Sequence, residues 1–214
     1  MSDERATDPV LHLIRERVST ERFDPQRDLS EQQIRELIED ATCAPSSFNI
    51  QHWRFVVVRR PADKELLKAA AYGQSVVTEA AVTFIVLGDT RGEEKLPEIM
   101  QVAVERGGMP QGKADAWVRM ARKIYADERI ARDEAIRSCS LAAMVMMLSA
   151  AARGWTTCAL SGFDSEQVRR GFDIDERYEP VMLLCAGHPA GPDERPKPRL
   201  SVDDVLAFDR GRSF

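Results

Sequence analysis

The alternation of apolar and polar positions predicts helices along much of the chain. Apolar residues recur every three or four positions over 10–18 and again over 34–41, which is the spacing of one helical face. Ser30 and Gln33 stand before the second stretch at capping-box spacing, so we expect that helix to begin after Ser30. Further helices are predicted over 61–71, in two pieces within 92–136 that break near 107–110, over 137–152, and after Asp164 with Gln167 in a second capping box.

Four short runs of β-branched, aromatic and other apolar residues predict strands between these helices. They cover residues 53–58, 82–87, 155–160 and 181–186. After them, the pattern predicts a charged, proline-rich surface loop over 189–200, a final turn capped by Ser201, and a short extended end over 205–208. Helices outnumber strands and separate them, so the pattern is consistent with an α+β or an α/β fold in one layered domain, 1–214.

Composition narrows the classes of function. The 214 residues are 43% apolar and 30% charged, which is ordinary for a globular protein. The net charge of -5 argues against a nucleic-acid partner, which would favour a basic face. The polar N-terminus lacks the apolar stretch of a signal peptide. The four cysteines form no CxxC pair, so we expect a cytoplasmic protein in which Cys139, Cys158 and Cys185 are small core residues.

One apolar segment is nearly membrane-like. Residues 141–152 read LAAMVMMLSAAA and lie between Arg137 and Arg153. This run is too short to span a bilayer, so we expect no membrane partner. A helix that is apolar on all sides is buried in a core or in an interface. More apolar surface is present than one subunit covers easily, which predicts a homodimer.

Motifs for phosphate loops, metals and hydrolysis are incomplete. Gly107, Gly112 and Lys113 match most of a phosphate loop, but Ala114 replaces the magnesium-binding hydroxyl and the preceding segment is helical in pattern. No GxGxxG is present. The three histidines are scattered without a partner at a catalytic or metal-binding spacing, so neither a hydrolytic triad nor a metal site is predicted.

Three polar segments remain as candidates for chemistry, and each has an ordinary structural interpretation as well. Residues 17–23, with arginine and serine at a helix end, are suited to an anion or to the edge of a planar ring, or form a solvated charged face. Residues 44–53 place hydroxyls and amides between a helix and a strand, as a ligand loop or as an Asn/Ser turn. Lys197 and Arg199 form a phosphate clamp or plain solvated charge.

Taken together and in order, these segments resemble the FMN-dependent nitroreductase family over about residues 10–208. The quoted motifs are Arg17/Ser19, the loop Pro45-Ser-Ser-Phe-Asn-Ile-Gln-His-Trp53, the apolar helix 137–152, Gly154-Trp155 with Gly162-Phe163-Asp164, Gly187-His-Pro189, and Lys197/Arg199. The loop is the most specific of them. The resemblance implies an α+β fold with a mainly antiparallel sheet flanked by helices, in an intertwined homodimer that holds two FMN molecules at its interface.

The resemblance also implies roles for particular residues. Arg17, Val18 and Ser19 would contact the flavin from one subunit, and the loop residues from the other. Backbone N–H groups of Ser161 and Gly162 would approach the N5/O4 edge of the flavin, and Lys197 with Arg199 would hold the phosphate. The full set of implied cofactor contacts is Arg17, Val18, Ser19, Pro45, Ser46, Ser47, Asn49, Gln74, Leu160, Ser161, Gly162, Lys197 and Arg199. No catalytic side chain and no metal is implied.

The activity implied is ping-pong electron transfer from NADH or NADPH to a small acceptor such as a nitroaromatic or a quinone. The alternatives are a specialised branch, namely flavin destruction or reductive dehalogenation, and a flavin-binding protein without turnover. A charged helical lid over about 90–130 and a C-terminal arm over about 200–214 complete the expected domain. Glu21 and His52 depart from the family pattern, which usually has a cation and a proline at these positions.

Overall fold

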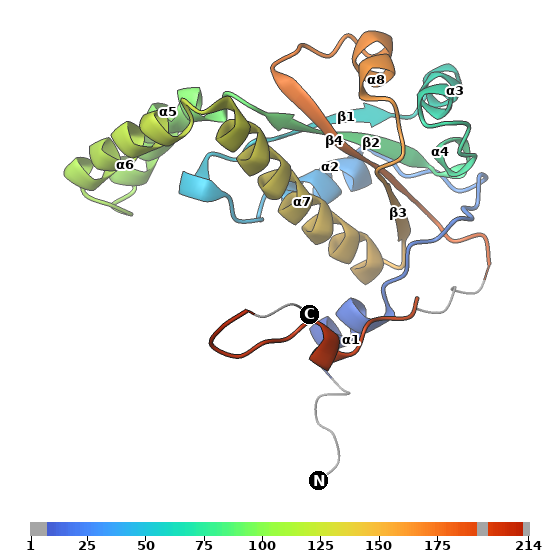
Figure 1. The fold of residues 1–214 in the computed structure, drawn as a ribbon. Coiled ribbons are helices and arrows are strands. Elements are labelled where there is room, and N and C mark those ends of the chain that lie inside the picture. The colour runs from blue at the N-terminus through green and yellow to red at the C-terminus, as the bar shows by residue number, and fades with distance from the viewer. Residues whose placement is uncertain (1–7, 192–196, 212–214) are drawn as a thin grey trace.

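Four strands form one antiparallel sheet in the order β1-β2-β4-β3 (Figure 1). They are β1 (Trp53–Val58), β2 (Val82–Asp89), β3 (Thr156–Leu160) and β4 (Tyr178–Gly187). The computed structural model describes residues 8–191 and 197–211, so most of the N-terminal tail and part of the 189–200 loop lie outside it. The purely antiparallel pairing decides between the two fold classes that the pattern allowed and confirms the α+β fold.

Eight helices and three short 3-10 turns surround the sheet in the described ranges. They are α1 (Pro9–Glu16), α2 (Glu31–Ala41), η2 (Ser47–Asn49), α3 (Pro61–Ala70), α4 (Val76–Glu79), η3 (Gly92–Lys95), α5 (Leu96–Glu105), α6 (Gln111–Ile124), α7 (Glu128–Ala152), α8 (Ser165–Gly171) and η4 (Val202–Asp204). The capping box of Ser30 and Gln33 is present in full. At α8, Asp164 caps the helix as predicted, but the Gln167 amide bonds the Asp164 carboxylate instead of the backbone.

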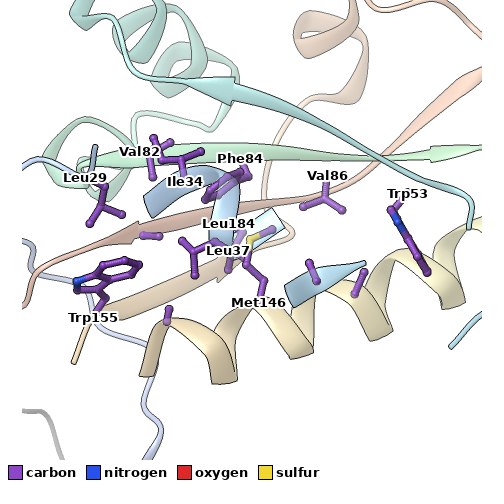
Figure 2. Close-up of a cluster of buried hydrophobic side chains, with 14 of the residues drawn as sticks. Leu29, Ile34, Leu37, Trp53, Val82, Phe84, Val86, Met146, Trp155 and Leu184 are labelled. Carbon is purple, nitrogen blue, oxygen red and sulfur yellow. The ribbon is translucent and has the colours of Figure 1, made fainter. Parts of the chain in front are cut away.

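The core lies on both faces of the sheet because side chains alternate along β2. Phe84 and its neighbours two residues away point to the face covered by α2 and α7, where they pack with Leu37 and Met146 (Figure 2). Ile85 belongs to the second cluster, which α3, α4 and α8 cover. Every residue of β2 is buried, so this strand is the centre of the two-sided core.

Helix α7 differs from its prediction. We expected a separate apolar helix to begin at residue 137, but one helix of 25 residues begins at Glu128 after the Asp127 cap. Its first half combines charged outer positions with buried alanines, and a Cβ on Gly88 would lie only 3.0 Å from the Ala135 Cβ, so α7 packs tightly on β2. Among the described helices, α7 alone is long and apolar enough to cross a membrane, a test that a core helix also passes.

Several apolar side chains stay uncovered on α1, on α7 and in the C-terminal segment. Val10 and Ile14 on α1 are 61% and 50% exposed, and Leu141 on α7 is 45% exposed. The expected extended end over 205–208 is not a strand in the structure: Val205 lies in a turn, and Phe208 lies in a bend and is 81% exposed. A strand needs a neighbouring edge to supply its hydrogen bonds, and none of the strands in the described ranges is paired with this segment.

The helices α5 and α6 form a separate cluster beside the sheet, joined to it through η3. The predicted break between them is present at Gly107, whose φ is +71°. At the junction, Gly92 lies against the segment that leads into β1. A Cβ at Gly92 would lie 2.7 Å from the Ile50 Cγ2 atom and 2.9 Å from the His52 Nδ1 atom.

The variant Gly92→Ala should therefore lower the free energy of unfolding by about 1–3 kcal/mol, the usual cost of overpacking. Urea unfolding measures this value. Gly112→Ala in α6 is the matched control, because nothing lies within 4 Å of a Cβ there. It should be neutral or stabilising by up to about 1 kcal/mol, since alanine favours helix more than glycine does. Equal free energies of unfolding for the two variants would show that η3 shifts away from Ile50 and His52 without a cost in stability.

Candidate functional site

Arg17, the first predicted site residue, lines a cavity at the edge of the sheet. It follows α1 directly, and the cavity of about 230 Å³ lies between that helix, the end of α7 and the start of β3. Val18, Met147 and Thr157 are among the other residues of the lining. The Nη1 atom of Arg17 is buried and has no hydrogen-bond partner among the residues that the structure describes. A buried cationic donor without a partner is costly, which indicates that an anion belongs beside it.

Ser19 is held next to the same edge by backbone pairing. It forms a parallel bridge with Thr157 of β3, and the Thr20 N–H donates to the Thr157 carbonyl at 3.1 Å. Lys197 returns to this region from the C-terminal tail, with its Nζ atom 3.8 Å from the Glu21 carboxylate. Glu21, one of the two departures from the family pattern, thus faces a cation supplied from the far end of the chain.

Arg199 is placed less favourably than predicted. Its Nη1 atom donates to the carbonyls of Lys197 and Pro198, so the guanidinium lies against its own segment. Both Lys197 and Arg199 are exposed. The described structure brings Lys197 to the segment after α1, but it shows no clamp in which both residues face one point.

At the other end of β3, the side chain of Gln74 contacts the segment whose backbone N–H groups were predicted to face the flavin. Its Nε2 atom donates to the Gly162 carbonyl at 2.8 Å and to the Ala71 carbonyl at 3.0 Å. Leu160 ends β3, and Ser161 and Gly162 are exposed directly after it. Gln74, one of the residues that the family resemblance implied, is therefore hydrogen-bonded to Gly162, another of them, although the two are 88 positions apart in the sequence.

The loop that carried the most specific motif has an unusual backbone. Phe48, Asn49 and Gln51 have φ values of 52°, 58° and 58°, a region that side chains other than glycine rarely occupy. The Ser46 Oγ atom accepts from the Gln51 N–H at 2.9 Å and so stabilises the turn. Pro45 and Asn49 are exposed. Such strain persists where the surroundings hold it, often at a binding site.

One chain does not bring all of these residues together. Figure 1 shows η2 beside α5 and α6, whereas α1 lies near the C-terminal end of α7. The loop 45–49 and the cavity at Arg17 are therefore at different ends of the molecule. A joint site would need a second chain.

The comparisons with known proteins decide the family. The model of the nitroreductase family matches residues 14–188. The chain belongs to the nitroreductase family. YodC of Bacillus subtilis, provisionally named an NAD(P)H nitroreductase, is 35% identical over 86% of this chain and 91% of its own length. MhqN of the same organism, with the same provisional name, is 36% identical over 92% of this chain and 97% of its own.

Solved structures agree with this assignment. A structure from Exiguobacterium sibiricum, described provisionally as a nitroreductase in complex with FMN, superposes on this chain with a TM-score of 0.86. It is 30% identical, and the match covers 94% of this chain and 98% of that one. A nitroreductase-fold structure from Bacillus subtilis also gives a TM-score of 0.86, at 36% identity over 92% and 97% of the two chains.

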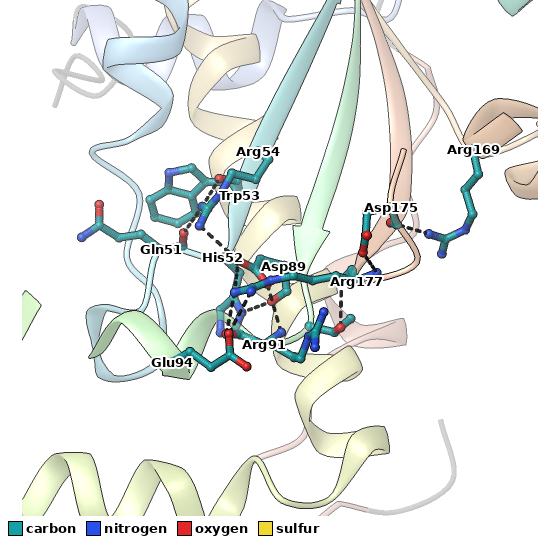
Figure 3. Close-up of polar contacts among 11 residues, drawn as sticks. Gln51, His52, Trp53, Arg54, Asp89, Arg91, Glu94, Arg169, Asp175 and Arg177 are labelled. Atoms are coloured by element: carbon teal, nitrogen blue, oxygen red, sulfur yellow. Dashed lines mark hydrogen bonds and ion pairs between the residues drawn. The ribbon is translucent and has the colours of Figure 1, made fainter. Parts of the chain in front are cut away.

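Sequence reasoning missed a buried polar cluster beneath the loop of this nitroreductase. Asp89, at the end of β2, is 0% exposed. Its carboxylate accepts from the Arg177 Nε atom at 2.6 Å and from Nη2 at 3.0 Å, and from the Arg54 Nη2 atom at 3.1 Å (Figure 3). These residues are far apart in sequence and belong to no motif. Buried charges need such pairing, but sequence spacing does not reveal it.

His52, named above only as a departure from the family pattern, belongs to this cluster. Its Nδ1 atom lies 2.7 Å from the Asp89 carbonyl oxygen and its Nε2 atom 3.2 Å from the Tyr125 hydroxyl. Burial lowers the pKa of His52 below its ordinary value of 6.5, although the hydrogen bond to the Asp89 carbonyl acts in the opposite direction. The ring is therefore neutral near pH 7.

The cysteines take no part in the site. Cys139, Cys158 and Cys185 are buried, as predicted, and Cys43 is exposed. Burial raises the pKa of Cys139 and of Cys185 to about 12, so neither is a thiolate at neutral pH. Within residues 8–191 and 197–211, no group of three or more His, Cys, Asp or Glu side chains is arranged to hold a metal.

The lowered pKa of His52 leads to a stability prediction. Well above pH 6.5, the ordinary pKa of histidine, the ring is neutral in both the folded and the unfolded chain. As the pH falls through that value, His52 becomes protonated in the unfolded chain but stays neutral in the folded chain, so the free energy of unfolding falls. The stability advantage of the native chain over His52→Gln should therefore shrink between pH 7.5 and about 5. Urea unfolding at several pH values measures it.

The His52→Gln variant is the reference for the native chain, because the two proteins differ in no other titrating group. His188, whose pKa is also lowered by burial, remains in both proteins. Parallel stability curves over this pH interval would mean that His52 becomes protonated in the folded state as readily as in the unfolded chain.

Proposed function

We propose that this nitroreductase binds FMN and transfers electrons from NADH or NADPH to small acceptors such as nitroaromatics or quinones, in a ping-pong order. The observation that carries the proposal is the buried, unpartnered Nη1 atom of Arg17 in the cavity beside β3. An anionic cofactor would supply the partner that this Nη1 atom lacks among the described residues. The relatives named as NAD(P)H nitroreductases and the FMN-bound neighbour support the choice of cofactor and electron donor.

The candidate residues, of which Arg17 and Val18 line the cavity, fit an FMN molecule in their chemistry. Arg17 and Lys197 are the cations for the phosphate or for the polar ring edge, with Arg199 assigned to the phosphate by the family pattern. Ser161 and Gly162 offer backbone N–H groups after β3, where electron density on a reduced ring would be stabilised. When bound, FMN supplies the redox chemistry by accepting and releasing a hydride. The protein orients it and needs no acid, base or metal of its own.

A homodimer completes the proposed site. The cavity at Arg17 is about 230 Å³, less than the roughly 300–1,000 Å³ of a usual cofactor pocket, so the single chain offers only part of a site. We propose that the loop residues Pro45, Ser46, Ser47 and Asn49 of a second copy provide the rest. The uncovered apolar side chains of α1 and α7, such as Val10 and Leu141, are a suitable surface for that copy.

The remaining parts of the proposal concern organisation. We propose one domain over 1–214, with α5 and α6 as a lid and the residues after 200 as an arm that crosses to the partner; residues 212–214 of the arm lie outside the described ranges. We also propose a cytoplasmic location, which agrees with the free cysteines.

Three measurements test the function together. The purified protein should be yellow and release FMN on denaturation, as identified by mass spectrometry. NADH or NADPH should bleach the flavin without oxygen, and a quinone or nitroaromatic should restore its colour. Steady-state double-reciprocal plots should give parallel lines. Light scattering should give twice the chain mass of 24.0 kDa at micromolar concentration.

Different results would reject different parts of this proposal. Absence of flavin binding after reconstitution would reject the function itself. Intersecting lines would reject only the ping-pong order. A monomer mass with FMN bound would reject the shared site.

Arg17→Ala should weaken FMN binding by about 10- to 100-fold, because charge-assisted hydrogen bonds contribute about 1.5–3 kcal/mol. Fluorescence titration of the apoprotein with FMN measures the dissociation constant. Arg15→Ala is the matched control, since Arg15 lies in the last turn of α1, two residues before Arg17, is exposed and does not line the cavity. An equal loss of affinity in the two variants would mean that only the general positive charge of α1 matters.

A further inference from the structure

The proposed lid packs as a unit of its own. In the described ranges, the apolar cluster that contains α5 and α6 shares no residue with the two clusters on the sheet. The chain enters this unit at Gly92, the first residue of η3, and leaves it at Tyr125, the residue after α6. Residues at the ends of elements are the usual hinges of a moving segment. Contacts at Gly92 and Tyr125 therefore decide how the lid is held against the sheet.

The imidazole of His52 lies against both ends of the lid, and its side chain is completely buried. On the entry side, a Cβ at Gly92 would lie 2.9 Å from the His52 Nδ1 atom, so the backbone of η3 packs directly on the ring. On the exit side, the Tyr125 ring stacks on the imidazole with centroids 5.5 Å apart at an angle of 16°. The Tyr125 hydroxyl lies 3.2 Å from the His52 Nε2 atom.

His52 is itself fixed to the end of the sheet through Asp89. The His52 carbonyl accepts from the Asp89 N–H at 2.8 Å, and the His52 Nδ1 atom lies 2.7 Å from the Asp89 carbonyl oxygen (Figure 3). A carbonyl only accepts hydrogen bonds, so Nδ1 carries the proton. In the neutral ring Nε2 is then an acceptor, and the Tyr125 hydroxyl donates to it.

We propose that His52 is a positioning residue that anchors both ends of the lid to the sheet. The lid opens when the hydrogen bond between the Tyr125 hydroxyl and the His52 Nε2 atom breaks, and the frequency of this opening sets the affinity for the electron acceptor. The proposal rests on the proposed function, because it assumes that α5 and α6 cover the acceptor.

Simple filling of the core explains these contacts less well. A leucine would occupy a similar space without needing any polar partner, whereas a buried imidazole is costly unless its nitrogens are hydrogen-bonded. Both nitrogens of His52 have partners, and these partners come from β2 and from the end of α6. The family pattern usually has proline here, which offers no side-chain donor or acceptor. The departure at position 52 therefore adds a polar anchor for the lid.

Hydrogen–deuterium exchange of the full-length protein, followed by mass spectrometry, tests the anchor. Tyr125→Phe keeps the stacked ring but loses the hydroxyl. It should speed exchange in peptides from α5 and α6 about 5-fold, in line with the loss of one neutral hydrogen bond, and should leave exchange in α2 unchanged. Tyr178→Phe on β4 is the matched control, because it removes a hydroxyl outside the lid and keeps the ring beside Arg177. It should exchange like the native chain.

Variants of His52 test whether the effect passes through this residue. His52→Gln keeps an acceptor for Tyr125 and should speed lid exchange less than 2-fold, whereas His52→Leu removes the acceptor and should speed it at least 5-fold. In the His52→Leu background, Tyr125→Phe should add less than 2-fold, because the partner of the hydroxyl is already absent.

Steady-state kinetics with a soluble quinone tests the link to acceptor binding. In Tyr125→Phe the KM for the quinone should rise about 5-fold while kcat changes less than 2-fold, since the change weakens enclosure of the acceptor and leaves electron transfer itself unaltered. A constant KM together with faster lid exchange would overturn this part of the proposal.

Two exchange results would overturn the anchor itself. One is unchanged lid exchange in both Tyr125→Phe and His52→Leu, and the other is an equal increase in α2, which would make His52 an ordinary core residue. Exchange needs no turnover, so it decides the anchor even if the native chain fails to reduce the quinone. That failure would reject only the proposed function and the link to acceptor affinity.

Discussion

The buried carboxylate of Asp89 holds three parts of the molecule together. It accepts from Arg177 in the turn before β4 and from Arg54 on β1. The Asp89 backbone N–H also donates to the His52 carbonyl, and the Asp89 carbonyl accepts from the His52 Nδ1 atom. The end of the sheet, the entrance to η3 and the loop before β1 thus share one residue. Removing one partner of such a buried pair leaves an uncompensated charge, which typically costs about 3–5 kcal/mol.

The tightly packed α7 places the two halves of the candidate site far apart. Its first half lies on β2 near Gly88, and its last turns reach the cavity at Arg17. A rigid helix of 25 residues keeps the loop 45–49 and Arg17 at opposite ends of one chain. A site that includes both groups would therefore need two chains, as proposed above.

The elements that were predicted well carry strong local signals. The capping box at Ser30 and the strand at Trp53 depend on neighbouring residues, and both are present in the structure. Helix α4 was missed because four residues are too few to show a period. The start of α7 was misplaced because its charged outer face concealed the buried alanines, such as Ala135, that pack on the sheet. The secondary structure of short segments, and of helices with one charged and one buried face, depends on the tertiary contacts that they make.

By itself, the sequence was sufficient to predict one layered domain of helices and strands, the family and the residues to examine for a cofactor, and the family resemblance implied the α+β class. These predictions follow from hydrophobic period, turn chemistry and the order of short motifs, all of which are local along the chain. Three features were decided only in the tertiary structure: the antiparallel strand order, the burial of the Arg17 Nη1 atom without a hydrogen-bond partner among the described residues, and the contacts of His52 with Asp89 and Tyr125. They depend on burial and on the direction of hydrogen bonds between distant residues, and a linear pattern contains neither.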